Sequence, residues 1–439
     1  MPLFKEIEHT AITDVGWKRS HNQDACTVQR APDREHWQRV GHLFIVADGM
    51  GGHAVGEMAS AKAIQEIPLI YVKQVKEAGP VAALRLAFQQ ANTDINTIGA
   101  SNPEFRGLGT TATALVLRNE GAWVAHVGDS RAYRVRGNQI QQLTYDHSFA
   151  WEMARRHGIP PEEFGDIKKN VIVRSLGPDT EVQVDVEGPY PLESGDTFIL
   201  CSDGLSNLVN PDEIGVIVSV LSTEEAGRLL VEIANLRGGP DNITVIVVRV
   251  GSSKDSVIAP LVKKPSRVLA LLKKAALGWN KRIPWPITIL MVGFLMALFF
   301  VFIIANAWPG AWAMFFLSAL TIAIGMGGLF YHAKQTQNQV VEEPEEPTRA
   351  SIHRQYPVRI DSALVDRWVT TTMQLKEQVE AREWTVDWQG YKKLVDAGLK
   401  ASHHQDWLAA FRYHLQALSR LASTYNRQRP KEESFQPKW

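Results

Sequence analysis

The feature that most constrains this fold is a run of 49 residues, Ile283 to Tyr331, without a single charged side chain. Two helices fit into it, Trp285 to Ala305 and Trp312 to Tyr331, joined by a turn at Asn306 to Gly310. Each is long enough to cross a hydrocarbon core of roughly 30 Å. A buried helical hairpin in a soluble core is the alternative. The absence of charge over the whole run favours two membrane helices.

The charges around this run predict its orientation. Residues 252–283 carry eight Lys and Arg against one acid, Asp255, and His332 and Lys334 follow the run. Positively charged flanks stay on the cytoplasmic side of a membrane. The run lies far from Met1, so it is not a signal peptide. We therefore expect a multi-pass protein of the cell (inner) membrane, with both the N-terminal domain and the C-terminal tail in the cytoplasm.

Composition excludes several other classes of protein. Forty-seven basic and forty-seven acidic residues give no net charge, so nucleic acid is not an expected partner. The two cysteines, Cys26 and Cys201, cannot build a disulfide framework and favour a reducing compartment. No Cys-x-x-Cys pair exists, which excludes zinc-ribbon and thioredoxin-like sites.

The composition along the chain predicts six segments. They are a catalytic domain (1–251), a basic linker (252–283), two transmembrane helices (284–331), a Glu/Pro-rich linker (332–360), a helical module (361–426) and a polar tail (427–439). The helical module has no catalytic constellation, and its aromatic-rich faces suit intramolecular docking or a protein partner.

The first segment reads as strands and helices set in blocks. β-branched runs predict strands at Leu43 to Ala47, Thr197 to Cys201 and Ile243 to Val250. A helix is expected from Thr223 to Leu236. This arrangement favours an α+β fold over a doubly wound parallel sheet.

Aspartates occur at expected strand ends or tight turns, within two residues of a glycine or asparagine. They are Asp14, Asp24, Asp48, Asp129, Asp203 and Asp241. Convergent carboxylates repel one another unless cations neutralise them. Oxygen ligands without a competing His or Cys pattern suit Mg²⁺ or Mn²⁺. Two such ions can activate a shared water for attack on phosphorus. A single Asp-Gly is a common turn, so the prediction rests on the joint pattern.

The motifs around these aspartates follow a known order. They are Asp14 to Asp24 (DVGWKRSHNQD), Val46 to His53 (VADGMGGH), Gly109 to Thr111, Gly128 to Arg131, Asp146 to Ser148, Ser202 to Leu205 and Asp241 to Thr244. Over about residues 8–250 the chain resembles the metal-dependent Ser/Thr protein phosphatases of the phosphatase 2C type, in their bacterial branch. The resemblance implies a sandwich of two antiparallel sheets flanked by helices, with the metals at one end.

The resemblance also implies roles for single residues. Asp48 would bridge two Mn²⁺ or Mg²⁺ ions, with the Gly49 carbonyl on one of them. Asp203 and Asp241 would complete the other metal site, and Asp129 would help to hold a third, looser ion. A water bridging the metals would attack phosphoserine or phosphothreonine of a phosphorylated protein, opposing a cognate Ser/Thr kinase.

Four further positions follow from the same motifs. Arg19 would bind the phosphate, since a planar guanidinium matches phosphate oxygens. Asp24 would orient the metal-bound waters, and Asn242 would position the Asp241 loop. Gln23 stands where the family usually has Glu, which predicts weaker metal binding.

A second departure concerns the acid, whereas the flap follows the family. Met50 replaces a His that some relatives use as an acid, and His53 is a candidate substitute. Residues 149–170 match the variable flap beside the site. Two alternatives stay open: a pseudo-phosphatase scaffold or sensor, for which Gln23 is the only support, and the related branch that acts on anti-sigma antagonists.

Overall fold

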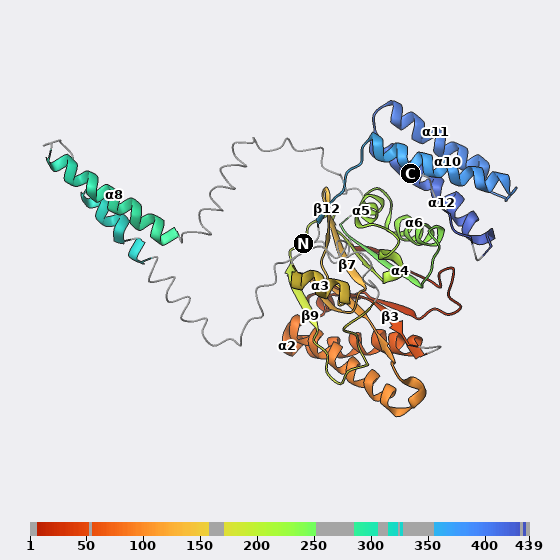
Figure 1. Ribbon diagram of the computed structural model, residues 1–439, viewed down its shortest axis with the longest axis horizontal. Helices are drawn as coiled ribbons and strands as arrows, with labels where there is room; N and C mark the ends of the chain where they lie inside the picture. The colour runs from red at the N-terminus through yellow and green to blue at the C-terminus, as the bar shows by residue number, and fades with distance from the viewer. Residues whose placement is uncertain are drawn as a thin grey trace. The chain divides into compact units, whose positions relative to one another are not determined.

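The computed structural model describes residues 7–51, 55–157, 171–251, 285–305, 315–323, 325–327, 355–430 and 433–435 (Figure 1). The chain divides into two compact units. The larger unit joins Met1–Ala259 with His353–Trp439, and the smaller unit is Pro260–Ile352. The predicted basic linker and most of the Glu/Pro-rich linker lie outside the described residues.

Within its described residues, the larger unit contains two antiparallel sheets, as predicted. The first has the strand order β1-β11-β10-β7-β8-β12, and the second has the order β2-β3-β5-β6-β9, with the short β4 paired to β3. The strands are β1 Ile7–Asp14, β2 Asp24–Gln29, β3 His42–Met50, β4 Gly109–Thr110, β5 Ala112–Arg118, β6 Gly121–Val127, β7 Arg131–Arg136, β8 Gln139–Gln142, β9 Asp185–Tyr190, β10 Thr197–Cys201, β11 Ile243–Val250 and β12 Gln355–Pro357.

Apolar side chains cover both faces of these sheets. In β3, Phe44 and Val46 belong to the core between the two sheets. Leu43 and Ile45, on the opposite face, pack with the residues of α2. This division follows from the pleat, which sends successive side chains to opposite faces. Strands buried on both faces therefore read as continuous apolar runs.

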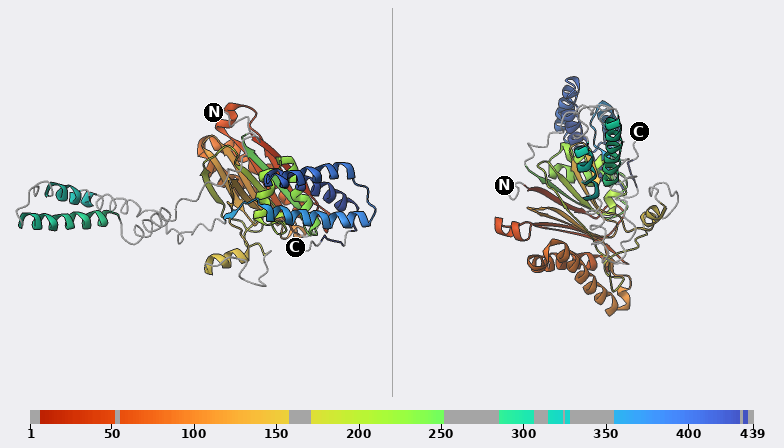
Figure 2. Two further views of the ribbon diagram at one scale, coloured as in Figure 1. Left: turned by 90° about the horizontal axis from the view of Figure 1, so that it is seen from above. Right: turned by 90° about the vertical axis from the view of Figure 1, so that its left-hand side faces the viewer.

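Helices cover the outer faces of the sandwich (Figure 2). The helices described in the larger unit are α1 Arg34–Arg39, α2 Val55–Ser101, the 3₁₀ turn η1 Pro103–Phe105, α3 Phe149–His157, α4 Asp203–Ser206, α5 Pro211–Val220, α6 Thr223–Leu236, α10 Ser362–Ala381, α11 Trp388–His403 and α12 Trp407–Gln428. α2 is kinked at Gly79, whose φ of 74° is not helical and which precedes Pro80. α6 has the predicted bounds, and the Ser222 side chain caps it by accepting a hydrogen bond from the Glu225 amide (3.2 Å).

The helical segment after residue 361 belongs to the same compact unit as the N-terminal domain, which is the intramolecular docking that its aromatic faces allow. The strand β12, just before this segment, pairs antiparallel with β8 at the edge of the first sheet. α12 then lies on α6, where the Ser419 hydroxyl donates to Glu232 Oε2 (2.6 Å) and Asn426 Nδ2 donates to the Glu232 carbonyl (3.0 Å). Its apolar face shares one core with α5 and α6. The helices therefore complete the larger unit.

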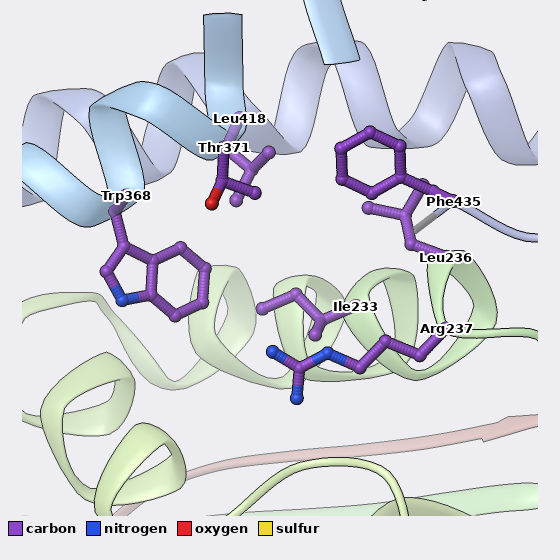
Figure 3. A pocket seen from close by; sticks show the side chains of 7 residues that line it. All are labelled: Ile233, Leu236, Arg237, Trp368, Thr371, Leu418 and Phe435. Carbon is purple, nitrogen blue, oxygen red and sulfur yellow. The ribbon is translucent and has the colours of Figure 1, made fainter. Parts of the chain in front are cut away.

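The predicted polar tail also differs in the structure. Arg429 is 4% exposed and Phe435 is 3% exposed, because both lie against the end of α6. The Phe435 amide donates to the Leu236 carbonyl (2.8 Å). Figure 3 shows the apolar contact between α6 and the C-terminal helices, with Trp368, Leu418 and Phe435 facing Ile233 and Leu236. The cavity left there is about 20 Å³, room for one water, so the surfaces are closely packed.

The smaller unit contains α8, Trp285–Ala305, with the bounds predicted from the sequence. The Phe300 ring lies 5.3 Å from that of Phe315, in the helical residues 315–323. In the described part of the chain, none of the helices meets the length and hydropathy that a membrane span requires. The predicted pair of membrane helices stays a prediction.

Candidate active site

Five of the aspartates gather at one end of the two sheets, because each lies where a strand begins or ends. Asp24 opens β2 and is paired across the sheet with Asp48 in β3. Asp203 opens α4 directly after β10, Asp241 precedes β11, and Asp129 follows β6. Strands from both sheets thus bring carboxylates that are up to 217 residues apart to one place.

Burial and repulsion by neighbouring carboxylates raise the pKa values of Asp24, Asp48, Asp129 and Asp203. Burial, followed by the charges of Asp203 and Asp241, raises the pKa of Asp24 to about 7, against the hydrogen bond from Ser202. Burial, then Asp203, raises the pKa of Asp129 to about 8. The pKa of Asp48 lies well above its usual range through burial and then the neighbouring carboxylates. Without a cation, such a cluster disfavours its own ionised form.

The carboxylate group fits a hard divalent cation. Asp24 Oδ1 and Asp129 Oδ1 are buried and have no hydrogen-bond partner. Carboxylate oxygens are the ligands that Mg²⁺ and Mn²⁺ prefer. As the side chains stand, the described residues include no group of three or more His, Cys, Asp or Glu side chains already set for a metal ion. The evidence that the group fits a divalent cation is therefore the chemistry of its carboxylate ligands and the two buried oxygens without a hydrogen-bond partner.

Arg19 reaches this end of the molecule through an ion pair. Its Nη2 donates to Asp241 Oδ2 at 2.8 Å, and the two side chains are 49% and 37% exposed. An exposed pair of this kind contributes little to stability. The guanidinium is therefore close to the carboxylate group and open to a ligand from solvent.

Asn242 connects the loop before β2 to the loop before β11. Its Nδ2 donates to the carbonyls of Val15 (2.7 Å) and His21 (2.9 Å), and its Oδ1 accepts from the Gln23 amide (2.8 Å). The Asn242 amide also donates to Asp241 Oδ1 (2.9 Å). The side chain thus fixes the relative position of the two loops.

Gln23 lies against the backbone that follows β3. Its backbone carbonyl accepts a hydrogen bond from the Gly49 amide (3.1 Å) and another from the Ser60 hydroxyl (2.6 Å). Its Nε2 donates to the Gly51 carbonyl at a long 3.5 Å. The amide is therefore directed toward the glycine turn that carries the Gly49 carbonyl.

Sequence reasoning assigned no role to several residues that support the site. The Ser202 hydroxyl donates to Asp24 Oδ2 (2.7 Å) and accepts from the Thr244 amide (2.9 Å). The Thr111 hydroxyl accepts from the Asp48 amide (3.0 Å). Both residues stand inside quoted motifs, and a hydroxyl beside a cluster of carboxylates is the signal that could have found them.

Asp14 is the aspartate that lies apart from the cluster. Its Oδ1 accepts from the Gly16 amide (2.8 Å) and from Asn235 Nδ2 (3.0 Å), so it shapes a loop. Gly16 has a φ of +76°, and a Cβ there would lie 2.0 Å from the Asp241 carbonyl oxygen. Only glycine fits this close approach.

Two other predicted features are partly or wholly outside the described residues. His53 lies in the gap at 52–54, and residues 158–170 of the predicted flap are likewise not described. Met50 is the last residue of β3. Beside the flap, His147 Nδ1 accepts from the Gly128 amide (3.0 Å) and Nε2 lies 3.2 Å from Asp185, which supports the turn before Asp129.

Comparisons with known proteins agree with this geometry. The family model for Protein phosphatase 2C matches residues 12–153. Protein phosphatase PhpP of Streptococcus pneumoniae is 36% identical over 247 residues, which are 55% of this chain and 97% of that protein. The crystal structure of serine/threonine phosphatase Stp1 from Staphylococcus aureus is similar with a TM-score of 0.50 and 29% identity, covering 57% of this chain and 98% of that one.

A further similar structure is the catalytic domain of serine threonine protein phosphatase PstP in complex with 2 manganese ions. It has a TM-score of 0.48 and 30% identity, and the match covers 56% of this chain and 99% of that one. In these matches, nearly the whole relative corresponds to a little over half of this chain.

Proposed function

The chain belongs to the protein phosphatase 2C family and is a protein serine/threonine phosphatase, and on this premise we propose that it hydrolyses phosphoserine and phosphothreonine on proteins with divalent cations held by its aspartate cluster. The observation that carries the proposal is the group of five convergent carboxylates: the pKa values of Asp24, Asp48, Asp129 and Asp203 are raised, and two buried carboxylate oxygens have no hydrogen-bond partner. A site of this charge favours cations and, through them, an anionic phosphate.

Different aspartates, together with one backbone carbonyl, bind the different ions. Asp48, the Gly49 carbonyl, Asp203 and Asp241 hold two Mn²⁺ or Mg²⁺ ions, and Asp129 helps to hold a third. When bound, these ions supply Lewis acidity toward the phosphate and make water more acidic. Asp24 is fixed by Ser202 through Oδ2 and keeps Oδ1 as an acceptor that orients water.

Arg19 binds the phosphate group of the substrate. Its ion pair with Asp241 keeps the guanidinium beside the cluster before substrate arrives. The planar donors of arginine match two phosphate oxygens, so the side chain can turn from Asp241 to the phosphate. This contact aligns the phosphorus with the cluster and supplies binding in both the ground state and the transition state.

Turnover tests this proposal directly. The purified chain, freed of metal with a chelator and then supplied with Mn²⁺ or Mg²⁺, is expected to release phosphate from phosphothreonine and phosphoserine peptides and from p-nitrophenyl phosphate. Absence of metal-dependent turnover in a folded sample would contradict the proposal and favour a phosphoprotein-binding scaffold. In the cell, the activity opposes a Ser/Thr protein kinase, so deletion should raise phosphorylation of that kinase's substrates.

The phosphatase acts at the inner face of the cell membrane, held there by the uncharged segment. Support comes from α8, which carries no charge and whose Phe294, Leu295 and Val301 are each more than 60% exposed. Such a surface is unusual in water and suits lipid. The contact of Phe300 with Phe315 supports an antiparallel pair.

The packing of the larger unit constrains the topology of this anchor. Met1–Ala259 and His353–Trp439 belong to one unit, so both lie on the same side of any membrane. The segment between them therefore crosses an even number of times. Reporters fused at Met1 and after Trp439 should both be cytoplasmic, and an external C-terminal reporter would refute the hairpin.

A further inference from the structure

The loop that carries Arg19 is held at its base by Trp17. The Trp17 and Lys18 amides both donate to the Gly239 carbonyl, at 2.7 and 3.1 Å. Gly239 lies two residues before Asp241, the partner of Arg19. A displacement of Trp17 therefore moves Arg19 relative to the carboxylate cluster.

The C-terminal segment holds the other side of Trp17. The Arg429 guanidinium carbon lies 4.6 Å from the centroid of the Trp17 ring, and Trp17 Nε1 donates to the Pro430 carbonyl at 3.3 Å. Trp17 is thus fixed on one side by the loop before β11 and on the other by residues more than 400 positions later in the chain.

Arg429 is itself firmly placed. It is 4% exposed, and its guanidinium donates to the Asn235 and Leu236 carbonyls at the end of α6. A buried arginine needs such acceptors, and its planar head can stack on an indole at the same time. Asn235 also donates to Asp14, at the start of the same loop, so the end of α6 supports the loop at a second point.

We propose that Arg429 and Pro430 of the C-terminal segment are positioning residues of the phosphatase, which set Arg19 for phosphate binding by holding Trp17. The inference rests on the proposed role of Arg19. It assigns the C-terminal segment a part in the active site, although the segment lies outside residues 12–153, which the family model matches.

This role follows from the high exposure of the Arg19 side chain, which leaves it little packing to hold it in place. Its side chain is half exposed, and the ion pair with Asp241 joins it to another loop residue. A long exposed side chain loses entropy when it binds a ligand, so a fixed backbone lowers the cost of binding. The Trp17 contact supplies that fixed backbone two residues away.

Trp17→Ala tests the contact from the loop side in the full chain. Loss of a cation–π contact and one hydrogen bond should raise KM for p-nitrophenyl phosphate by about three- to tenfold, with kcat within about twofold of wild type. Trp17→Phe keeps a ring for Arg429 but loses the hydrogen bond to the Pro430 carbonyl, so its KM should lie between those of wild type and Trp17→Ala. A variant that merely lost folded protein would lower kcat at constant KM.

Arg429→Gln tests the same contact from the C-terminal side and should raise KM similarly. The matched control is Arg382→Gln, because Arg382 also stacks on an indole, that of Trp384, and pairs with Glu433, all within the C-terminal segment. This control should leave KM unchanged. If Arg429→Gln does not fold in a thermal melt, Trp17→Ala decides the question.

A double-mutant cycle separates this inference from the proposed function. If Trp17 acts through Arg19, Arg19→Ala combined with Trp17→Ala should have the KM of Arg19→Ala alone, within about twofold. Additive effects, or an unchanged KM in folded Trp17→Ala, would overturn the inference while leaving Arg19 in place. An unchanged KM in Arg19→Ala would overturn the phosphate-binding role and this inference together.

Discussion

The carboxylate of Asp203 is the single group whose replacement most directly tests metal holding. Asp203→Asn keeps the shape of the side chain but removes a charge that repels Asp241 and attracts a cation. Turnover with Mn²⁺ should fall by at least about a hundredfold, while the melting temperature without metal stays equal or rises. Asp212→Asn, at an exposed position of α5, is the control and should behave as wild type. Normal turnover in Asp203→Asn would refute the metal assignment.

Gln23 gives a second test at the residue scale, in which the substitution is expected to tighten metal binding. In Gln23→Glu the new carboxylate cannot donate to the Gly51 carbonyl, and its negative charge is attracted toward a bound cation. The Mn²⁺ concentration for half-maximal activity should fall by roughly three- to tenfold, as for other groups that support metal ligands. Gln38→Glu adds the same charge at an exposed site and should change nothing. An unchanged or weaker half-saturation in Gln23→Glu would mean that its side chain does not face the metals.

Elements of secondary structure were the most predictable part of this molecule. The strands Thr197–Cys201 and Ile243–Val250 and the helix Thr223–Leu236 have the bounds that their apolar patterns predicted. The acids Asp48 and Asp203 could be singled out because they belong to a joint pattern of carboxylates and ordered motifs, although a single Asp-Gly is a common turn. For Ser202 the sequence offers only its place beside Asp203, because its bond to Asp24 joins residues 178 positions apart and leaves no local pattern that names the partner.

The position of the C-terminal helices was likewise unpredictable for a physical reason. The apolar face of α12 shows that the helix needs a partner, but any apolar surface of the right shape satisfies it. The partner helix α6 carries apolar residues such as Leu229, Leu230 and Ile233, a pattern that is equally typical of an ordinary core helix. The hydrogen bonds that fix the docking, such as Ser419 to Glu232, involve residue types common on any helix surface.

The contact between α6 and α12 should respond to pH through Glu232. Burial raises the pKa of Glu232 to about 7, against the Ser419 hydrogen bond and the charges of Arg228 and Arg427. A carboxyl with a pKa raised by folding binds its proton more tightly in the folded state. Its contribution is fully present below its unfolded pKa, near 4.5, and is lost as pH rises through 7.

Glu232→Gln should therefore raise the melting temperature at pH 8 and leave it nearly unchanged at pH 5. The gain in the free energy of unfolding at pH 8 relative to pH 5 should be up to about 3 kcal/mol. Glu225→Gln is the matched control, because Glu225 also contacts α12, through Gln416, but has a lowered pKa. It should show no gain at pH 8. Equal melting temperatures of Glu232→Gln and wild type at pH 8 would contradict the assignment.

At the scale of the whole molecule, the C-terminal segment and the family domain should behave as one folding unit. Removing residues 353–439 uncovers the apolar face of α6 and releases Trp17. The melting temperature should fall by roughly 5 °C or more, and KM for p-nitrophenyl phosphate should rise, while the metal ligands keep turnover at saturation. Replacing residues 260–352 by a flexible linker is the control. It removes the smaller unit, keeps every contact of the larger one, and should preserve both the melting temperature and KM. A truncated chain with the stability and KM of this control would show that the C-terminal helices only rest on the phosphatase domain.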